Sequence, residues 1–576
     1  MTSTSNRPDA EASPVAQERL RLGVSLARKD DLERADRQLA AAVALDPSDA
    51  RLHYNFALVA ARQGRGRVAE SFYRSALSLD RRHRSSLNNL GQLLMAQKRQ
   101  SEAETQFRAS LACDPVQPHC HSAIGIICLG LNRVVEARHH LAAALALAPD
   151  YGLALHNMGL LSDRDGRADA AKHWFALATA TKDPPAEAYF SLGVAAQKAG
   201  HADRAVGLYR EALARMPDNT DARANLANAL IEVGDIDEAL AEIGRALDGR
   251  PDHPDLLWSL SWIKLLRGDL DAGFATYGVR WARAHESNRQ KQFNAPLWDG
   301  RRVEHGRLLL WGESGVGDEV LCAGMIGDAL AAGNQVVIET DRRFVPLFQR
   351  SYPGAEVVLR KTPPEPPAVA SDIVAQSSTL RLPMLLRRRW QDFPKHQGYL
   401  KPDPVRVADY RQRFARLGPG RKIGLAWAST NARTGGRKST RLEDWMPVLS
   451  VPGVQFVSLQ YGADNRQIEL LRTRGVSNLW ANPSPDIRAD LEALAAQIAA
   501  LDAVVTIAGI NAHMCGALGK PGLVLVQHTP LWFWFDRGET SPWYPSLTLI
   551  RQDKSLDWQA PIARIAAALA TDRPAG

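Results

Sequence analysis

Small residues recur along the first half of the chain with a period of 34 residues, and this regularity limits the possible folds more than any other feature. Stepping by 34 from Gly23 meets only Gly, Ala or Ser as far as Ser261, and a second series holds alanine at every step from Ala35 to Ala239. Small side chains at a fixed period are expected where two helices cross closely. Proline, which ends one helix and begins the next, follows a third series at Pro47, Pro115, Pro149, Pro217 and Pro251.

A 34-residue unit of helix, turn, helix and proline is typical of tetratricopeptide repeats. We therefore predict a disordered N-terminus over residues 1–15 and an α-solenoid of such repeats over residues 16–270, with about seven repeats and one final helix. Solenoids of this kind bind polypeptides in their inner groove.

Asparagine occupies one position of the first helix in several repeats, on a single 34-residue grid. Asparagine is unfavourable in the middle of a helix, so this series of asparagines, the asparagine ladder, requires an explanation. The ladder resembles that of animal O-GlcNAc transferases, in which asparagines of a similar repeat domain grip the backbone of the acceptor polypeptide. The alternative, that these side chains merely face solvent, stays open. The predicted acceptor-binding residues are Asn55, Asn89, Asn157 and Asn225.

The second half of the chain has the pattern of an α/β protein. The 34-residue series fail after about residue 270, and every tryptophan except Trp174 follows residue 257. Short apolar runs typical of buried parallel strands alternate with helical stretches. We expect strands at 307–311, 335–339, 356–359 and 372–375, and again at 422–428, 454–459, 503–508 and 523–527.

Two such series in succession predict two Rossmann-like lobes with a ligand cleft at the carboxyl ends of the strands. We expect a connector over 271–304, the first lobe over 305–400, an interlobe linker over 401–420, and the second lobe over 421–572.

Composition argues against several classes of function. The net charge of +8 comes without a long basic block, so we expect no nucleic-acid partner. The N-terminus lacks a secretory signal and no run is apolar enough for a membrane span, which favours a cytoplasmic protein. The five cysteines form no CxxC pair, and no acidic pair has a persuasive metal-binding context. We therefore expect neither a metal site nor a cofactor.

A glycine-rich segment, WGESGVGDE, follows the first expected strand of the second half. Glycines after a strand allow a tight turn and a close approach of the backbone to a ligand. The segment and the preceding PLWDG resemble a block of bacterial tetratricopeptide-repeat glycosyltransferases related to heptosyltransferases. The resemblance implies that Asp318 is the catalytic base, which takes a proton from the acceptor hydroxyl. The alternative is that Asp318 or Glu319 only caps the following helix.

The expected strand 422–428 runs into a polar loop, ARTGGRKSTR. A glycosyltransferase without a metal must neutralise the departing phosphate with basic side chains and helix amides. By resemblance to the same family, Lys438 and Ser439 contact the donor phosphate. A solvated surface loop is the alternative.

The segment IAGINAHMCGALGKP carries the most specific likeness to this family, in which Asp-Thr-x-x-x-His precedes GALGKP. His513 and the run from Gly516 match, whereas Ala508 and Gly509 replace the Asp and Thr. Between these two positions and His513, Asn511 is the only polar residue that compensates for the missing Asp and Thr. The resemblance implies donor binding by His513, Asn511 and Gly516, and it implies that the SPWYP (541–545) and IRQ (550–552) segments shape the pocket or the core. A purely structural histidine is the alternative.

The resemblance covers nearly the whole chain and implies the two-lobed GT-B architecture of a metal-independent protein O-glycosyltransferase. The expected reaction transfers a sugar from a nucleotide donor to Ser or Thr of a polypeptide acceptor, with flagellin as the expected acceptor and a CMP-activated nonulosonic acid such as pseudaminic acid as the expected donor. Three alternatives stay open: a UDP-sugar donor, a polysaccharide-building enzyme, and a non-catalytic adaptor with a degenerate transferase domain.

Overall fold

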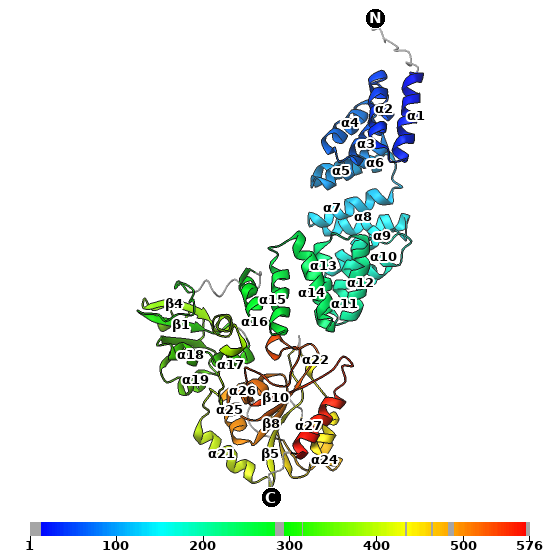
Figure 1. Cartoon of the computed structure of the whole chain (residues 1–576). Helices are drawn as coiled ribbons and strands as arrows, with labels where there is room; N and C mark the ends of the chain where they lie inside the picture. Colours follow the sequence, from blue (N-terminus) through cyan, green and yellow to red (C-terminus); the bar gives the residue numbers. More distant parts are fainter. Residues whose placement is uncertain are drawn as a thin grey trace. The chain divides into compact units, whose positions relative to one another are not determined.

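The computed structural model describes residues 13–282, 293–313, 315–431, 435–461, 465–481 and 489–571 (Figure 1). The chain forms two compact units, residues 1–222 and 223–576. Most of the segment predicted to be disordered, residues 1–12, lies outside the described residues, and the first helix begins at Pro14. Part of the connector predicted over 271–304 also lies outside them, at residues 283–292.

The first unit is entirely helical. Its helices pack as consecutive pairs, as a tetratricopeptide solenoid requires. They are α1 (Pro14–Arg28), α2 (Leu32–Leu45), α3 (Ala50–Arg62), α4 (Gly66–Leu79), α5 (Arg84–Ala96), α6 (Gln100–Cys113), α7 (Pro118–Gly130), α8 (Val134–Leu147), α9 (Gly152–Arg164), α10 (Ala168–Thr179), α11 (Ala186–Lys198) and α12 (Ala202–Arg215).

The small residues of the 34-residue series lie where the two helices of a pair cross. A β-carbon at Gly91 would come within 2.8 Å of the Phe107 ring, and one at Gly159 within 2.3 Å of the Phe175 ring. The alanines of the second series are buried in the same contacts. The turns within the pairs also repeat, because the residue at every 34th position from Asp30 to Gly268 has a positive φ. The predicted tetratricopeptide architecture is confirmed.

The second unit begins with further helices of the same kind. These are α13 (Thr220–Val233), whose first residues belong to the first unit, α14 (Ile236–Gly249), α15 (Pro254–Leu266) and α16 (Leu270–Tyr277). Helix α16 packs on α15, so the helical pairs continue into the segment expected as a connector. A short 3-10 helix, η1 (Gly278–Ala282), follows.

Two separate parallel sheets make up the rest of the second unit. The first has the order β3-β2-β1-β4 and consists of β1 (Arg307–Trp311), β2 (Gln335–Thr340), β3 (Ala355–Leu359) and β4 (Ile373–Ser378). The second has the order β10-β9-β8-β5-β6-β7 and consists of β5 (Arg421–Ala426), β6 (Val454–Ser458), β7 (Leu479–Trp480), β8 (Ala503–Ile507), β9 (Gly522–Val526) and β10 (Leu547–Arg551).

Helices accompany both sheets and complete the two predicted lobes. They are α17 (Val316–Ala323), α18 (Ile326–Ala331), α19 (Val345–Ser351), α20 (Leu382–Leu386), α21 (Pro404–Ala415), α22 (Gly435–Lys438), α23 (Met446–Leu449), α24 (Asn465–Thr473), α25 (Leu491–Ala500), α26 (Ile510–Ala517) and α27 (Gln559–Thr571). Helix α21 fills most of the segment 401–420, which was expected to be only a linker, and packs on α25.

The last repeat helices pack directly on the α/β region of the same unit. The Trp390 indole N–H donates to the carbonyl of Gly268 at 3.1 Å, and the backbone N–H of Asp536 donates to Leu266 at 3.0 Å. The rings of Phe274 and Tyr277 lie edge-on to Trp532. These contacts join α15, α16 and the turn between them to Trp390, which follows α20, and to the aromatic segment that follows β9. Among the described residues, no helix combines the length and the apolar character needed to cross a bilayer.

Candidate functional site

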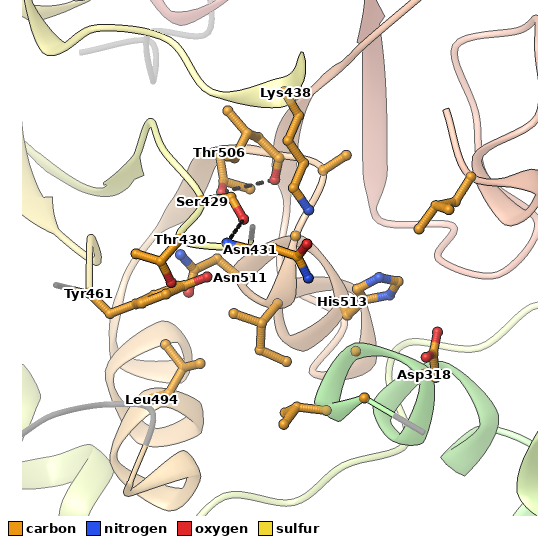
Figure 2. A pocket seen from close by; sticks show the side chains of 18 of the residues that line it. Asp318, Ser429, Thr430, Asn431, Lys438, Tyr461, Leu494, Thr506, Asn511 and His513 are labelled. Carbon is orange, nitrogen blue, oxygen red and sulfur yellow. Dashed lines mark hydrogen bonds between the residues drawn. The ribbon is translucent and has the colours of Figure 1, made fainter. Parts of the chain in front are cut away.

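A cavity of about 440 Å³ lies where the two sheets present the carboxyl ends of their strands (Figure 2). In the second sheet it lies beyond β5 and β8, between which the strand order reverses, and ligands of open parallel sheets bind at such a point. Both lobes contribute to its lining, which includes Gly315, Gly317, Asp318, Arg343, Ser429, Thr430, Asn431, Lys438, Tyr461, Leu494, Thr506, Ala508, Gly509, Asn511, His513, Phe533 and Trp534.

The first lobe supplies the first turn of helix α17. Gly315 is the N-cap residue, and Asp318 lies in the first turn and lines the cavity. Glu319 points the other way: its side chain is buried, accepts a hydrogen bond from Thr340 Oγ1 at 2.6 Å and pairs with Arg360. Burial raises the pKa of the Glu319 carboxyl. The structure thus separates the two acids, with Asp318 at the cavity and Glu319 in the core.

A loop after β5 supplies the basic group of the second lobe. The Ser439 hydroxyl accepts a hydrogen bond from the Ser429 N–H at 2.8 Å, and Thr440 is bonded to the carbonyl of Trp427. These contacts hold the short helix α22 against the end of the strand. As a result Lys438 lines the cavity, whereas Ser439 does not and instead supports the loop. Burial lowers the pKa of the Lys438 ammonium.

Helix α26 begins at the cavity, with Gly509 as its N-cap residue. Asn511, in its first turn, is 4% exposed, and its amide N–H donates to the carbonyl of Leu459 at 3.3 Å. Among the described residues, no group donates a hydrogen bond to the buried Asn511 Oδ1. A buried acceptor without a donor is costly, so a ligand that offers an N–H or O–H would bind favourably here.

His513 lies one turn further along α26 and is 5% exposed. Its ring packs against Phe533, Trp534 and Tyr544, with centroid distances of 5.1–5.7 Å. Burial, together with the charge of Lys438, lowers the pKa of His513 to about 3. The imidazole is therefore neutral at physiological pH and does not add a positive charge to the cavity.

The predicted donor-binding residue Gly516 does not line the cavity. A β-carbon there would lie 2.3 Å from the Tyr544 ring, and one at Gly519, which has a φ of +68°, would lie 1.9 Å from the carbonyl oxygen of Gln397. The backbone N–H groups of Tyr399 and Leu400 donate to the carbonyl of Ala517. The GALGKP segment is thus shaped by close packing against the segment that joins the lobes.

We expect Gly516→Ala to destabilise the second unit by about 1–3 kcal/mol, because the added methyl group must displace the buried Tyr544 ring. The measurement is the shift in the thermal unfolding midpoint. Gly436→Ala is the matched control, since a β-carbon there meets open space. A destabilisation of Gly436→Ala as large as that of Gly516→Ala would contradict this account.

Several cavity residues were not predicted from the sequence. Arg343 follows β2, Tyr461 follows β6, and Thr506 lies at the end of β8. Arg343 is held by an ion pair with Asp341 at 2.8 Å. Each lies at or just beyond the carboxyl end of a parallel strand. The rule that ligands of such sheets bind at these ends was therefore the sequence signal that indicates these residues.

The asparagine ladder lies in the first helices of the repeats, as the sequence indicated. In the first unit, the amide groups of Asn55 and Asn157 donate to carbonyls of their own helices, at 2.7 and 2.6 Å, and Asn89 donates to the Tyr54 hydroxyl at 3.3 Å. Asn157 is buried, and Asn225, on α13 of the second unit, is half-buried. Asn157 is therefore less available to a partner than the prediction assumed.

A smaller cavity of about 170 Å³ adjoins the first and shares Lys438, Ala508, Leu531 and Trp534 with it. Its other wall comes from the repeat helices, through Ile231 and Glu232 of α13 and Trp262 of α15. Glu232 also pairs with Arg437. The repeat helices of the second unit therefore reach the loop that carries Lys438.

One group of potential metal ligands lies close together among the described residues: Glu104, Cys128 and Glu136 of the first unit. Arg108 and Arg133 form ion pairs with both glutamates. The arginines already neutralise these carboxylates, so the group offers no convincing metal site.

Comparison with known proteins identifies the repeats and one curated relative. The tetratricopeptide repeat family matches residues 20–82, 56–118 and 196–263. The chain is 32% identical over 313 residues to protein FlbA of Caulobacter vibrioides, an alignment that covers 52% of this chain and 52% of that protein. The chain thus spans about half the length of this relative.

Two of the solved structures found by comparison match only the repeat-sized part of this chain. PilF of Pseudomonas aeruginosa is 22% identical, with a TM-score of 0.32, and the match covers 36% of this chain and 95% of that one. MamA of Desulfovibrio magneticus is 18% identical, with a TM-score of 0.28, and covers 29% and 93%. The family matches and the helical pairs show that the chain carries tetratricopeptide repeats. A two-sheet α/β region follows them, and the alignment shows that the chain is related to FlbA.

Proposed function

We propose that the protein is a metal-independent protein O-glycosyltransferase of GT-B architecture. One observation carries the proposal: a carboxylate from the first lobe, Asp318, and an ammonium group from the second, Lys438, line the same cavity at the carboxyl ends of two parallel sheets. A sugar transferase needs both groups, one to accept the proton of the attacking hydroxyl and one to neutralise the departing phosphate.

In this proposal, the phosphate of the donor lies against the Lys438 ammonium and the first turn of α26, where backbone N–H groups and the helix dipole favour an anion. Asp318 accepts the proton of a Ser or Thr hydroxyl. The hydroxyl oxygen forms a bond to the anomeric carbon while the bond from that carbon to the phosphate oxygen breaks. The nucleotide leaves with the negative charge, which Lys438 balances.

The opposite side of the cavity suits the nucleoside. Figure 2 shows Thr430, Tyr461 and Leu494 on one side of the cavity, away from Asp318 and His513. This side offers an aromatic ring, an apolar wall and the buried Oδ1 of Asn511 that lacks a donor. A nucleobase has flat apolar faces and N–H groups at its edge, and it would satisfy both features. A CMP-activated nonulosonic acid remains the proposed donor, with a UDP-sugar as the alternative.

Tetratricopeptide repeats bind polypeptides, which supports a polypeptide acceptor. We propose flagellin, modified in the cytoplasm. The repeat helices α13 and α15 line the smaller cavity beside Lys438, so a polypeptide held on these helices would lie close to the donor.

A non-catalytic adaptor is the second candidate function. The observation that favours it is the close packing of Gly516 and Gly519. This packing explains why the GALGKP motif, which most resembles a transferase, would be retained for folding in a protein without activity. Ala508 and Gly509, which lack the polar groups of the family, point the same way.

The test is to incubate the purified protein with flagellin and a panel of nucleotide sugars, and to measure the intact mass of the flagellin. A mass gain equal to one sugar supports the transferase and identifies its donor. Tight binding of flagellin without a mass gain from any donor would favour the adaptor.

We expect Lys438→Gln to weaken nucleotide binding about tenfold or more, since a hydrogen bond to a charged group contributes about 1.5–3 kcal/mol. The affinity is measured by calorimetry. Because burial lowers the pKa of Lys438, the wild-type affinity should fall as pH rises towards that pKa, and this occurs at a lower pH than for an exposed lysine. Arg437→Gln, which alters the side chain paired with Glu232, is the control. Equal losses in both variants would contradict the assignment.

A further inference from the structure

The smaller cavity beside the candidate site is lined by a buried side-chain amide, that of Gln527, which is 8% exposed. Gln527 directly follows β9, whose carboxyl end lies beside that of β8 in the second sheet. Within the described part of the chain, no group donates a hydrogen bond to its Oε1 atom. A buried acceptor without a donor lowers stability, so this amide is better suited to a ligand than to the fold.

A second buried glutamine at the same edge of the sheet shows the usual arrangement. Gln552 directly follows the neighbouring strand β10 and is 6% exposed. Its Oε1 accepts a hydrogen bond from the backbone N–H of His528 at 3.2 Å, and its Nε2 donates to the carbonyl of Leu556 at 2.7 Å. The amide of Gln552 therefore holds the backbone around it, which the Oε1 atom of Gln527 does not do.

The walls of the smaller cavity select the charge of the ligand. Glu232 is paired with Arg437, so its negative charge is balanced, while Lys438 adds a positive charge to the lining. A cationic ligand is therefore disfavoured by repulsion. An ionised carboxylate or phosphate has no proton to donate to Gln527 Oε1. A neutral group with an N–H or O–H remains.

A primary amide meets these conditions best. One of its N–H groups donates to Gln527 Oε1 while its own oxygen accepts from Gln527 Nε2, so the two amides form a pair of hydrogen bonds. A trans secondary amide makes only one of these bonds, because its N–H and its carbonyl point in opposite directions.

The size and the apolar surface of the cavity suit such a group on a short alkyl stem. A cavity of about 150 Å³ holds a benzene ring, and the smaller cavity has about 170 Å³. An Asn or Gln side chain therefore fits, and its methylene groups pack on the apolar walls. These walls are formed by Ile231, Trp262, Pro530, Leu531 and Trp534.

We propose that the smaller cavity is an acceptor subsite, in which Gln527 pairs with the side-chain amide of an Asn or Gln near the modified Ser or Thr. This inference rests on the proposed function and adds a sequence preference to it. A polypeptide is the source of the amide because the repeat helices α13 and α15 form one wall of the cavity. Lys438, Ala508, Leu531 and Trp534 also line the candidate site, so the bound side chain belongs to a residue close to the reacting hydroxyl.

The first measurement determines whether the fold needs the Gln527 amide. Leucine has a similar size but neither a donor nor an acceptor. We expect Gln527→Leu to keep or raise the midpoint of thermal unfolding, since it removes an acceptor that lacks a donor. Gln552→Leu is the matched comparison and should lower the midpoint, because it leaves the N–H of His528 and the carbonyl of Leu556 without their partner. An equal drop in both variants would assign Gln527 to the fold and overturn the proposal.

The ligand is identified with the full chain and a set of Ser-centred peptides in which one flanking residue at a time is Asn, Gln or Leu. Affinity is measured by calorimetry without a donor. At the position that reaches the cavity, we expect the wild type to bind the amide peptide about tenfold more tightly than the Leu peptide. Gln527→Leu should bind the two peptides equally, within about twofold. Gln559→Leu is the control and should keep the preference, because Gln559 is exposed and lies outside both cavities.

The subsite and the proposed function fail in different ways. If the wild type binds and glycosylates the peptides but prefers no amide at any position, the subsite is overturned and the transferase stands. If Gln527→Leu instead weakens binding of the nucleotide or the nucleotide sugar, the amide belongs to the donor site, and the acceptor subsite is again overturned. If the wild type binds neither peptides nor nucleotide sugars, the proposed function fails and the subsite fails with it.

Discussion

Asp318→Asn is expected to lower the rate of sugar transfer by about 100-fold or more, which is the usual contribution of a general base. The asparagine has nearly the same shape but cannot accept a proton from the attacking hydroxyl. Because Asp318 lies on the opposite side of the cavity from Thr430, Tyr461 and Leu494, the affinity for the nucleotide should change by less than about twofold (Figure 2). Transfer is followed by the intact mass of the acceptor, and affinity by calorimetry.

The matched control is Asp299→Asn. Asp299 belongs to the same sequence block as Asp318, but its side chain is exposed and lies outside the cavity. We expect this variant to keep the wild-type rate. Asp318→Asn with an unchanged rate would remove Asp318 from the mechanism and leave it as a residue that favours the N-terminus of α17 through its charge.

Arg280→Met should lower the free energy of unfolding of the second unit by about 3–5 kcal/mol, because it leaves the carboxylate of Glu313, whose side chain is only 11% exposed, without its partner. Arg280 is 3% exposed and forms two hydrogen bonds to Glu313, at 2.6 and 2.9 Å, and a third to the Ser378 hydroxyl. Its guanidinium also lies over the rings of Tyr277 and Trp281. The pair ties the end of the repeats to the turn that follows β1.

The size of this effect is tested by urea unfolding followed through tryptophan fluorescence. The double variant Arg280→Met, Glu313→Leu should recover most of the loss, since two apolar side chains leave no buried charge behind. Arg307→Met is the control: Arg307 pairs with Asp372 and Glu356, whose side chains are about half exposed, and we expect a loss below about 1 kcal/mol. A small effect of Arg280→Met, with no recovery in the double variant, would show that the ion pair is not needed.

The fold was predictable where the sequence repeats or alternates strongly. The 34-residue series located the helical pairs, because each small residue marks a helix crossing such as that of Gly91 with Phe107. The eight predicted strands are present to within a few residues. The strand expected over 422–428 ends earlier, at Ala426, because the N–H groups of Trp427 and Ala428 bond to the Gln460 side chain instead of a strand.

Two strands were missed for different reasons. β7 has two residues, which is too short for any periodic signal. β10 (Leu547–Arg551) was seen only as part of a family motif, although its apolar and polar residues alternate at first. Helix α16 was missed although the second small-residue series reaches it: Gly273 is one further step of 34 residues after Ala239, and a β-carbon there would lie 2.6 Å from Leu265 of α15.

The candidate site was predictable in part. Asp318, Lys438, Asn511 and His513 come from three distant segments, and the structure brings all of them to one cavity. The sequence also predicted Ser439 and Gly516 as donor-binding residues. In the structure, Ser439 supports the loop after β5, and Gly516 packs closely against Tyr544. A sequence motif shows which residues occur together and does not show which of them face the ligand.

The sequence by itself determined the repeat period, the order of helices and strands, and the segments that meet at the carboxyl ends of the two sheets, because these depend on local periodicity and on a general rule of parallel sheets. Only the tertiary structure decided that Glu319 is buried while Asp318 faces the cavity, that Arg343 and Tyr461 join the lining, and that His513 is neutral. The physical reason is that burial, charge state and hydrogen-bond direction depend on residues far away in the chain. For His513 these are the rings of Phe533, Trp534 and Tyr544, which bury the imidazole, and the charge of Lys438.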